Sequence, residues 1–140
     1  MQGAREAIER ISRAGFIPIV VTNQPEISRG NIKVEDLKAM HDHLSKELGI
    51  THFFVCVHDD GDHCTCRKPK PGLLLKAATE LDIDLTKSKM VGDRWKDIAC
   101  GQHVGCECFF VDYHYAEAKP LQPFTRVTSL LEASYRIIGE

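Results

Sequence analysis

The stretch Phe16-Ile17-Pro18-Ile19-Val20-Val21-Thr22-Asn23 is a short apolar run that ends abruptly in polar residues. Its length and its β-branched residues are typical of a strand that is buried on both faces, as strands of parallel sheets are. Apolar residues recur before it at helical spacing, namely Ala4, Ala7, Ile8, Ile11 and Ala14, and Gly15 is the expected stop. A helix followed by a buried strand is the unit of a parallel α/β fold.

The same alternation continues along the chain. Further helices are expected over residues 34–48, 72–81, 98–104 and 128–138, and further strands over residues 52–57, 90–91 and 106–111. This pattern predicts a Rossmann-like three-layer α/β sandwich, in which helices cover both faces of a parallel sheet. Because we find no internal repeat, low-complexity tract or linker, residues 1–140 are expected to form a single domain.

The composition excludes several classes of protein. A hydrophobic fraction of 43% and a charged fraction of 27% argue against disorder and fibres. The formal net charge of −2 lacks the positive excess of a nucleic-acid binder. No apolar run approaches the roughly 18 residues of a membrane span, and the first residues lack the apolar segment of a secretory signal. We therefore expect a cytoplasmic protein that binds neither nucleic acid nor membrane.

Polar side chains follow the predicted strands at the points where the strands end. Thr22 and Asn23 close one strand, and Asp93 follows another after Gly92, with Asp97 four residues later. In parallel α/β sheets ligands bind beyond the carboxyl ends of the strands. Hydroxyl and amide groups can donate hydrogen bonds to an anion, and carboxylates bind divalent cations. The sequence therefore predicts an anion and a cation side by side at this edge.

The loop after the second predicted strand carries clustered cysteines and histidines. Cys56 and His58 form one chelating pair and Cys64 and Cys66 a second, each with one intervening residue. Two such pairs can close a tetrahedral zinc site, and four protein ligands leave no open position, so its role would be structural. His63 is an alternative histidine ligand. Without a metal, Cys56 would be a core residue and the remainder a surface loop.

Arg67 and Lys68 follow the last of these cysteines directly. Arginine can hold a phosphate through two parallel hydrogen bonds, and lysine offers a point charge. A loop ordered by a metal would fix both cations near the strand ends, where they would face the predicted anion. The alternative is that both are solvated surface cations before Pro69.

Taken in order, these motifs resemble the haloacid dehalogenase (HAD) superfamily of phosphatases. They are Val21-Thr22-Asn23-Gln24, then Cys56-x-His58…Cys64-x-Cys66-Arg67-Lys68-Pro69-x-Pro71-Gly72, then Met90-Val91-Gly92-Asp93-x-x-x-Asp97. The resemblance covers nearly the whole chain, including residues 27–30 and 101–106. Within the superfamily the chain is similar to the D-glycero-D-manno-heptose 1,7-bisphosphate 7-phosphatase group, with histidinol-phosphate phosphatases as relatives. The Cys/His loop joined to Arg-Lys-Pro is the most specific part.

The resemblance implies a role for each matching residue. Thr22 and Asn23 would bind the transferring phosphoryl group, and Lys68 would stabilise its charge. Arg67 and Arg29 would bind the substrate, a small phosphorylated sugar or similar phosphomonoester. The implied metal ligands are Asp93 for Mg²⁺, supported by Asp97, and Cys56, His58, Cys64 and Cys66 for a structural Zn²⁺. In this family an aspartate attacks phosphorus, and water then hydrolyses the aspartyl-phosphate.

One part of the family pattern is absent from the sequence. The family's nucleophile lies in an Asp-x-Asp-x-Thr motif on a central strand before the first helix, and no such motif precedes Ala4. We therefore expect an N-terminally incomplete HAD-like domain that lacks its first, central strand and whose phosphatase activity is absent or impaired. The gap predicts either a rearranged four-stranded sheet or a homodimer that fills it. The segment 82–86 imitates the motif, but we expect it between a helix and a strand, at the opposite edge.

Two other functions remain as alternatives. The first is a non-catalytic relative that keeps the zinc loop and the phosphate-binding groups as a binding or assembly module. The second is a thiol-redox protein that uses Cys106 and Cys108, which share one face of a predicted strand. Because no cation neighbours these thiols in the sequence to lower their pKa, core packing is the expected role of both.

Overall fold

The computed structural model describes residues 3–24, 27, 29–58 and 63–139. Helices and strands alternate along the chain, as the sequence predicts. The elements are α1 (Ala4–Arg13), β1 (Ile19–Asn23), α3 (Val34–Leu48), β2 (His52–Cys56), α4 (Gly72–Leu81), the 3-10 helix η2 (Leu85–Lys87), β3 (Lys89–Gly92), α5 (Trp95–His103), β4 (Glu107–Val111), β5 (Thr125–Val127) and α6 (Leu130–Ile138). Every strand pair is parallel, so the expected α/β class is confirmed.

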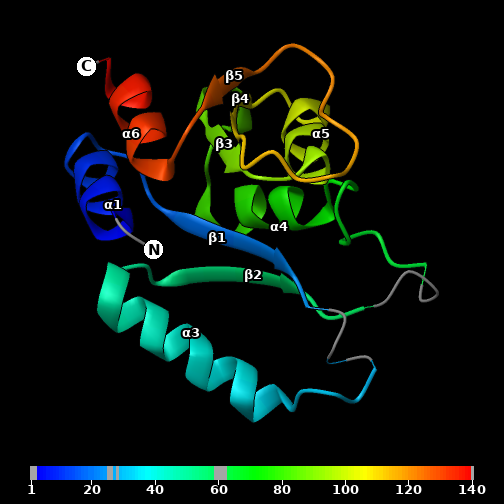
Figure 1. Ribbon diagram of the computed structural model, residues 1–140. Coiled ribbons are helices and arrows are strands. Elements are labelled where there is room, and N and C mark those ends of the chain that lie inside the picture. The colour runs from blue at the N-terminus through cyan, green and yellow to red at the C-terminus, as the bar shows by residue number, and fades with distance from the viewer. Residues whose placement is uncertain (1–2, 25–26, 28, 59–62, 140) are drawn as a thin grey trace.

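The strands form two parallel sheets (Figure 1). In the first sheet β1 pairs with β2, and Ile19 lies opposite His52. In the second, β4 lies between β3 and β5. Among the residues that the structure describes, β1 and β3 share no ladder of hydrogen bonds, so the expected four-stranded sheet is wrong. The carbonyl oxygen of Val21 in β1 instead accepts a hydrogen bond from the Lys68 side chain. The homodimer stays a prediction.

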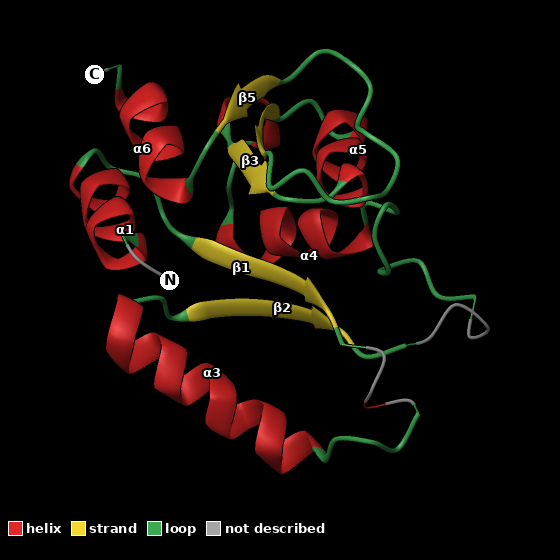
Figure 2. Cartoon of the chain, in the orientation of Figure 1, coloured by secondary structure: helices red, strands yellow, loops and turns green. Residues whose placement is uncertain are grey.

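Helices cover both faces of the strands, which confirms the expected three layers (Figure 2). Helices α4 and α5 lie on one face, where Leu74, Ile98 and Cys100 pack against side chains of β3 and β4. Helix α6 packs on the opposite face of the three-stranded sheet, and α1 packs against α6. Helix α3 runs beside β2, where His41 stacks on Phe53 with ring centroids 4.5 Å apart. None of the described helices combines the length and the apolar character needed to cross a bilayer.

Strand β4 is buried on both faces, as the centre of a parallel sheet must be. Its Cys108 and Phe110 face α5, and its Phe109 and Val111 face α6. Burial raises the pKa of the Cys108 thiol to about 12, and burial also raises the pKa of Cys106. A thiol that stays protonated is a poor nucleophile, which disfavours the redox alternative and agrees with core packing.

Two of the differences from the sequence-based expectation have a clear physical reason. Strand β1 begins at Ile19 rather than Phe16, and Pro18, which has no N–H group to donate, stands immediately before it. Strand β5 was not predicted at all, because its three residues are too few to show an alternation of apolar and polar side chains. It pairs with β4, with Val127 opposite Val111.

Asp112 follows β4 and ties the next loop to the sheet. Its side chain is 7% exposed and lies 3.1 Å from Arg126 Nε on β5 and 3.4 Å from Lys119 Nζ. The backbone N–H of His114 donates to Asp112 Oδ1 at 2.8 Å. This hydrogen bond, with the neighbouring cations, holds the pKa of Asp112 below its ordinary value. The loop over residues 113–119 is thereby fixed at both of its ends.

We expect Asp112→Asn to destabilise the protein in a pH-dependent way. Because the pKa of Asp112 is lower in the folded than in the unfolded state, its charged form stabilises the fold above the unfolded pKa. That stabilisation is lost as the pH falls through the folded pKa. Thermal unfolding followed by circular dichroism should show a lower Tm for the variant than for the wild type at about pH 7. The difference between the two Tm values should narrow towards about pH 3. An equal gap at both pH values would contradict this account.

Candidate functional site

Lys68 lies at the centre of the predicted phosphate-binding residues. Its ammonium group donates to Val21 O at 3.3 Å and to Asp97 Oδ1 at 2.5 Å. Its backbone N–H donates to Asn23 Oδ1 at 3.2 Å. The side chains of Lys68 and Asp97 are only 13% and 10% exposed. Lys68 therefore joins the end of β1 to the first turn of α5 and brings the Arg67-Lys68 motif to the strand ends.

Asp97 uses both of its carboxylate oxygens within the protein. Oδ1 accepts from Lys68, and Oδ2 accepts from the backbone N–H of Arg94 at 3.2 Å, which caps the start of α5. The carboxyl group also packs over Gly92, where a Cβ atom would collide with it. Asp97 therefore positions Lys68, whereas the sequence led us to expect that it supports the magnesium site at Asp93, and that support stays a prediction. Gly92 is the residue type that this packing requires.

Asp93 presents the second carboxylate at the end of β3. It is half-buried, and its Oδ2 accepts a hydrogen bond from the Tyr115 hydroxyl at 2.9 Å. This hydrogen bond raises the pKa of Tyr115. A carboxylate oxygen is the hard ligand that Mg²⁺ prefers, and Mg²⁺ commonly uses one or two protein carboxylates together with substrate phosphate. Asp93 fits that requirement. The contact with Tyr115 has no signal in the sequence.

Thr22 and Asn23 lie at the end of β1, at the same edge as Asp93. The Thr22 hydroxyl accepts from Gln24 Nε2 at 3.3 Å and lies 3.4 Å from Asn23 O. The side-chain oxygen of Asn23 accepts a hydrogen bond from the Lys68 backbone N–H, so the side-chain NH₂ group remains as a donor for an anion. The structure therefore gathers three predicted phosphate ligands, Thr22, Asn23 and Lys68, around one strand end.

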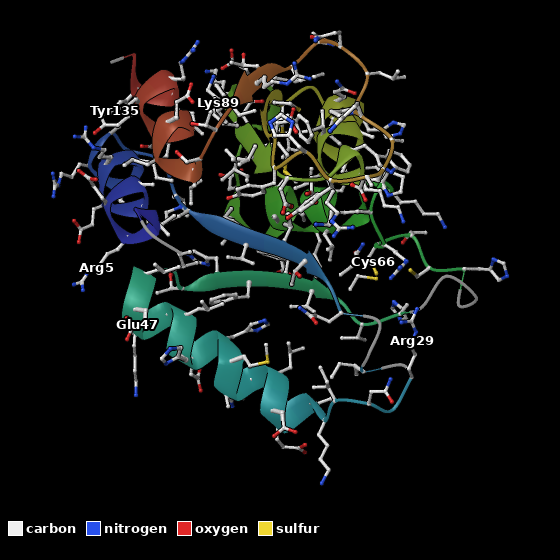
Figure 3. All side chains as sticks on the ribbon, in the orientation of Figure 1. Arg5, Arg29, Glu47, Cys66, Lys89 and Tyr135 are labelled. Atoms are coloured by element: carbon white, nitrogen blue, oxygen red, sulfur yellow. The ribbon has the colours of Figure 1, made fainter. Side chains whose placement is uncertain are left out.

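The two predicted substrate-binding arginines lie on loops at this end of the molecule. Arg67 Nη1 donates to His58 O at 3.2 Å, so its guanidinium group is tied to the Cys/His loop. Arg29 is exposed on the segment that follows β1. Figure 3 shows Arg29 and Cys66 at the end of the molecule towards which β1 and β2 run. Their role in binding substrate stays a prediction.

The predicted zinc ligands form one compact cluster. Their ligand atoms in Cys56, His58, Cys64 and Cys66 all lie within 4.8 Å of one another. Cys56 Sγ is 3.6 Å from both His58 Nδ1 and Cys64 Sγ, and His58 Nδ1 is 3.3 Å from Cys66 Sγ. A tetrahedron with metal–sulfur bonds of about 2.3 Å has edges of about 3.8 Å, so the cluster could bind zinc. His63, the alternative ligand, is not part of it.

The thiols of the cluster differ in their pKa. Burial and hydrogen bonding to the Cys66 thiol raise the pKa of Cys56 to about 12. Burial alone would raise the pKa of Cys64, but the backbone N–H of Arg67 and the neighbouring thiols together lower it to about 7. Because zinc binds the thiolate form, loading such a cluster releases protons.

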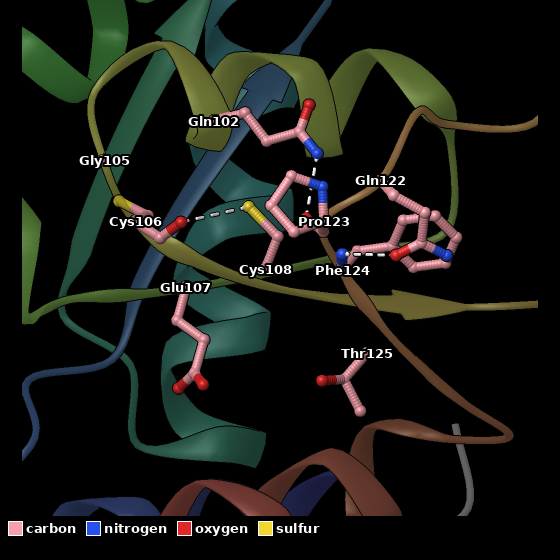
Figure 4. Close-up of a pocket in the computed structure, with 9 residues that line it drawn as sticks. All are labelled: Gln102, Gly105, Cys106, Glu107, Cys108, Gln122, Pro123, Phe124 and Thr125. Atoms are coloured by element: carbon pink, nitrogen blue, oxygen red, sulfur yellow. Dashed lines mark hydrogen bonds between the residues drawn. The ribbon is translucent and has the colours of Figure 1, made fainter.

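Two other features lie at the opposite edge of the sheets. The segment 82–86 joins α4 to β3, where Asp84 Oδ1 accepts from Thr86 N and Oγ1 at 2.9 and 2.6 Å, so it stands at the amino end of β3 as predicted. A cavity of about 410 Å³ opens at the amino ends of β4 and β5 (Figure 4). Its lining residues are Gln102, Gly105, Cys106, Glu107, Cys108, Gln122, Pro123, Phe124 and Thr125. Neither feature contains a predicted phosphate or metal ligand, and the cavity is lined by Cys106 and Cys108, the two thiols of the redox alternative.

Comparison with known proteins gives a consistent family. Residues 65–133 match the model of the HAD-hydrolase-like family. The D-glycero-beta-D-manno-heptose-1,7-bisphosphate 7-phosphatase of Bordetella bronchiseptica is 32% identical over 116 residues, which are 79% of this chain and 65% of the relative. The enzyme of the same name from Pseudomonas aeruginosa is 38% identical over 109 residues, 73% of this chain and 60% of the relative. The chain thus spans somewhat less than two thirds of these relatives.

Solved structures agree with the sequence relatives. The heptose bisphosphate phosphatase of B. bronchiseptica, crystallised with magnesium and phosphate, superposes with a TM-score of 0.90 at 26% identity. That match covers 99% of this chain and 83% of the other. A HAD-like phosphatase from Mesorhizobium loti gives a TM-score of 0.75 at 30% identity and covers 95% of this chain and 70% of the other.

The geometry of the Cys/His cluster predicts that Cys66→Ser loses zinc. Removing one of four ligands leaves an incomplete site, and a structural zinc contributes directly to folding, so the Tm should also fall. Elemental analysis of the purified protein should find about one zinc per chain in the wild type and much less in the variant. The matched control is Cys106→Ser, a half-buried thiol outside the cluster, which should retain zinc. Full zinc content in Cys66→Ser would contradict the assignment.

Proposed function

The chain belongs to the HAD-like hydrolase family, and from this premise we propose that it is a phosphatase domain whose site binds the phosphate of a phosphorylated sugar. The observation that carries the proposal is the placement of Lys68, held between the end of β1 and Asp97. A nearly buried ammonium group at the carboxyl ends of parallel strands is a strong anion ligand, because solvent screens it little.

Each residue of the site has a distinct task in this proposal. The Thr22 hydroxyl and the Asn23 NH₂ group donate hydrogen bonds to phosphoryl oxygens, while Lys68 stabilises their negative charge. Asp97 holds the Lys68 ammonium in place through their ion pair. Asp93 would hold Mg²⁺, which when bound neutralises further charge on the phosphoryl group. Arg67 and Arg29 would contact the remainder of the substrate.

We further propose that the Cys/His cluster holds a structural zinc. Four protein ligands close the coordination sphere, so this metal would have no position for substrate. Its task is to order the segment that leads into Arg67 and Lys68. The Lys70 ammonium supports the same segment by donating to Cys64 O at 2.7 Å, and Gly72 N–H donates to Thr65 O at 3.1 Å.

The chemical step needs a carboxylate nucleophile that the described site does not offer. Asp97 has both oxygens engaged, and Asp93 is assigned to the metal. We therefore propose that these 140 residues by themselves bind phosphate and Mg²⁺ but hydrolyse phosphomonoesters slowly or not at all. Aspartyl-phosphate chemistry would then require a carboxylate outside them. The second candidate function, a zinc-containing phosphate-binding or assembly module, follows if the chain works without such a group.

The proposed substrate is a heptose bisphosphate or a sugar phosphate of similar size. Support comes from the names of the curated relatives, which are heptose 1,7-bisphosphate 7-phosphatases. Arg67 and Arg29, on the loops at this end of the molecule, would suit a substrate that carries a second phosphate, because a guanidinium group binds phosphate through paired hydrogen bonds.

We expect Lys68→Met to weaken the binding of inorganic phosphate by about tenfold or more, because a hydrogen bond to a charged group contributes about 1.5–3 kcal/mol. Isothermal titration of the zinc-loaded chain in Mg²⁺ measures this binding. Lys87→Met is the matched control, since Lys87 lies in η2 at the amino edge of β3 and should leave the affinity unchanged. Equal affinities in all three proteins would exclude the proposed site.

A parallel assay measures Mg²⁺-dependent phosphate release from heptose 1,7-bisphosphate by the same chain and by Asp93→Asn. The expected result is binding with little or no release. Rapid release that Asp93→Asn abolishes would show that a carboxylate within the chain serves as nucleophile, and would overturn the proposed impairment while supporting a phosphatase.

A further inference from the structure

Four side chains form a row that ends at the proposed magnesium ligand. Arg94 Nη1 lies 3.1 Å from Glu117 Oε2. The Arg94 guanidinium carbon lies 4.9 Å from the centroid of the Tyr115 ring. The Tyr115 hydroxyl in turn donates to Asp93 Oδ2 at 2.9 Å. Residues from two segments, the start of α5 and the loop after β4, thus meet at one carboxylate.

The loop that carries Tyr115 is held in place independently of Asp93. Asp112 fixes it through the backbone of His114 and the ammonium of Lys119. Within the loop the backbone N–H of Glu117 donates to Tyr115 O at 2.9 Å. The position of the Tyr115 ring is therefore set by the loop and not by Asp93. The Asp93 carboxylate, which follows the end of β3, has to orient itself towards the Tyr115 hydroxyl.

We propose that Tyr115 is a positioning residue that restricts Asp93 to one-oxygen coordination of a divalent cation. The Tyr115 hydroxyl occupies Oδ2, so Oδ1 is the oxygen that the carboxylate offers to the cation. Mg²⁺ takes single oxygens in a strict octahedron, whereas Ca²⁺ readily takes both oxygens of one carboxylate. Tyr115 therefore favours Mg²⁺ over Ca²⁺. This inference rests on the proposed magnesium site at Asp93.

The expected size of the effect follows from other metal sites. Partners that orient a metal-ligating side chain through hydrogen bonds typically change metal affinity by about 10- to 100-fold when they are removed. Tyr115→Phe removes one oxygen atom and keeps the ring, so its stacking with Arg94 is preserved. The Asp93 carboxylate can then rotate and offer both oxygens, which suits Ca²⁺.

The test measures cation binding directly on the zinc-loaded chain. Free Mn²⁺ is followed by electron paramagnetic resonance while Mg²⁺ or Ca²⁺ displaces it from the protein. For Tyr115→Phe we expect the Mg²⁺ affinity to fall about tenfold or more and the Ca²⁺ affinity to fall less or to rise, so that the preference for Mg²⁺ declines. An unchanged ratio of the Mg²⁺ affinity to the Ca²⁺ affinity would overturn the inference, even if both affinities fell. A general loosening of the site would weaken the binding of both cations to the same extent.

Tyr113→Phe is the matched control. Tyr113 belongs to the same loop, and its ring centroid lies 5.8 Å from that of Tyr115. Among the described contacts, Tyr115 is the tyrosine whose hydroxyl reaches Asp93. Tyr113→Phe should therefore leave both affinities unchanged, and a loss of preference equal to that of Tyr115→Phe would also overturn the inference.

Asp93→Asn separates this inference from the proposed function. If the wild type binds Mn²⁺ and Asp93→Asn abolishes that binding, the magnesium site stands and the Tyr115 result decides the inference alone. If Asp93→Asn binds Mn²⁺ as well as the wild type does, the magnesium site at Asp93 fails, and the inference fails with it.

Discussion

The buried ion pair between Lys68 and Asp97 is the interaction on which the rest of the structure depends. It connects two sheets that, within the described residues, share no strand ladder. Removing two charges from water is unfavourable unless hydrogen bonds satisfy both groups. Here Lys68 also donates to Val21 O, and Asp97 also accepts from Arg94 N–H. The pair is thus satisfied on both sides, and the lysine that it fixes is the proposed phosphate ligand.

The Cys/His cluster and the proposed phosphate site are connected through one short segment of the chain. The segment from Cys64 to Lys68 runs from the cluster directly to the strand ends, and Arg67 ties it back to His58 O. A loop with few apolar side chains cannot order itself by burial, so a metal in the cluster would supply the order. Metal binding at the cluster would then determine how precisely the Lys68 side chain is positioned. A structural metal can in this way affect anion binding without touching the anion.

The sequence predicted what depends on local spacing. The chelating pairs, the residues at the strand ends and most helices follow from periodicity and from short motifs, and the structure places them as expected. Contacts between distant residues have no such signal. The pairing of Lys68 with Asp97 spans 29 residues, and the hydrogen bond from Tyr115 to Asp93 spans 22. The expected four-stranded sheet was wrong for the same reason, because the pairing of two strands is also a contact between distant residues. In the structure the Val21 carbonyl of β1 accepts a hydrogen bond from the Lys68 side chain.

A double-mutant cycle on Lys68→Met and Asp97→Asn tests the central claim most directly. The free energy of unfolding, measured by urea denaturation of the wild type, both single variants and the double variant, gives the coupling between the two side chains. We predict a coupling of about 1–3 kcal/mol, against at most about 1 kcal/mol for the same cycle on the more exposed pair Lys89 and Glu107. Equal coupling in the two cycles would contradict the account, because the pair that joins the sheets would then contribute no more than a surface contact.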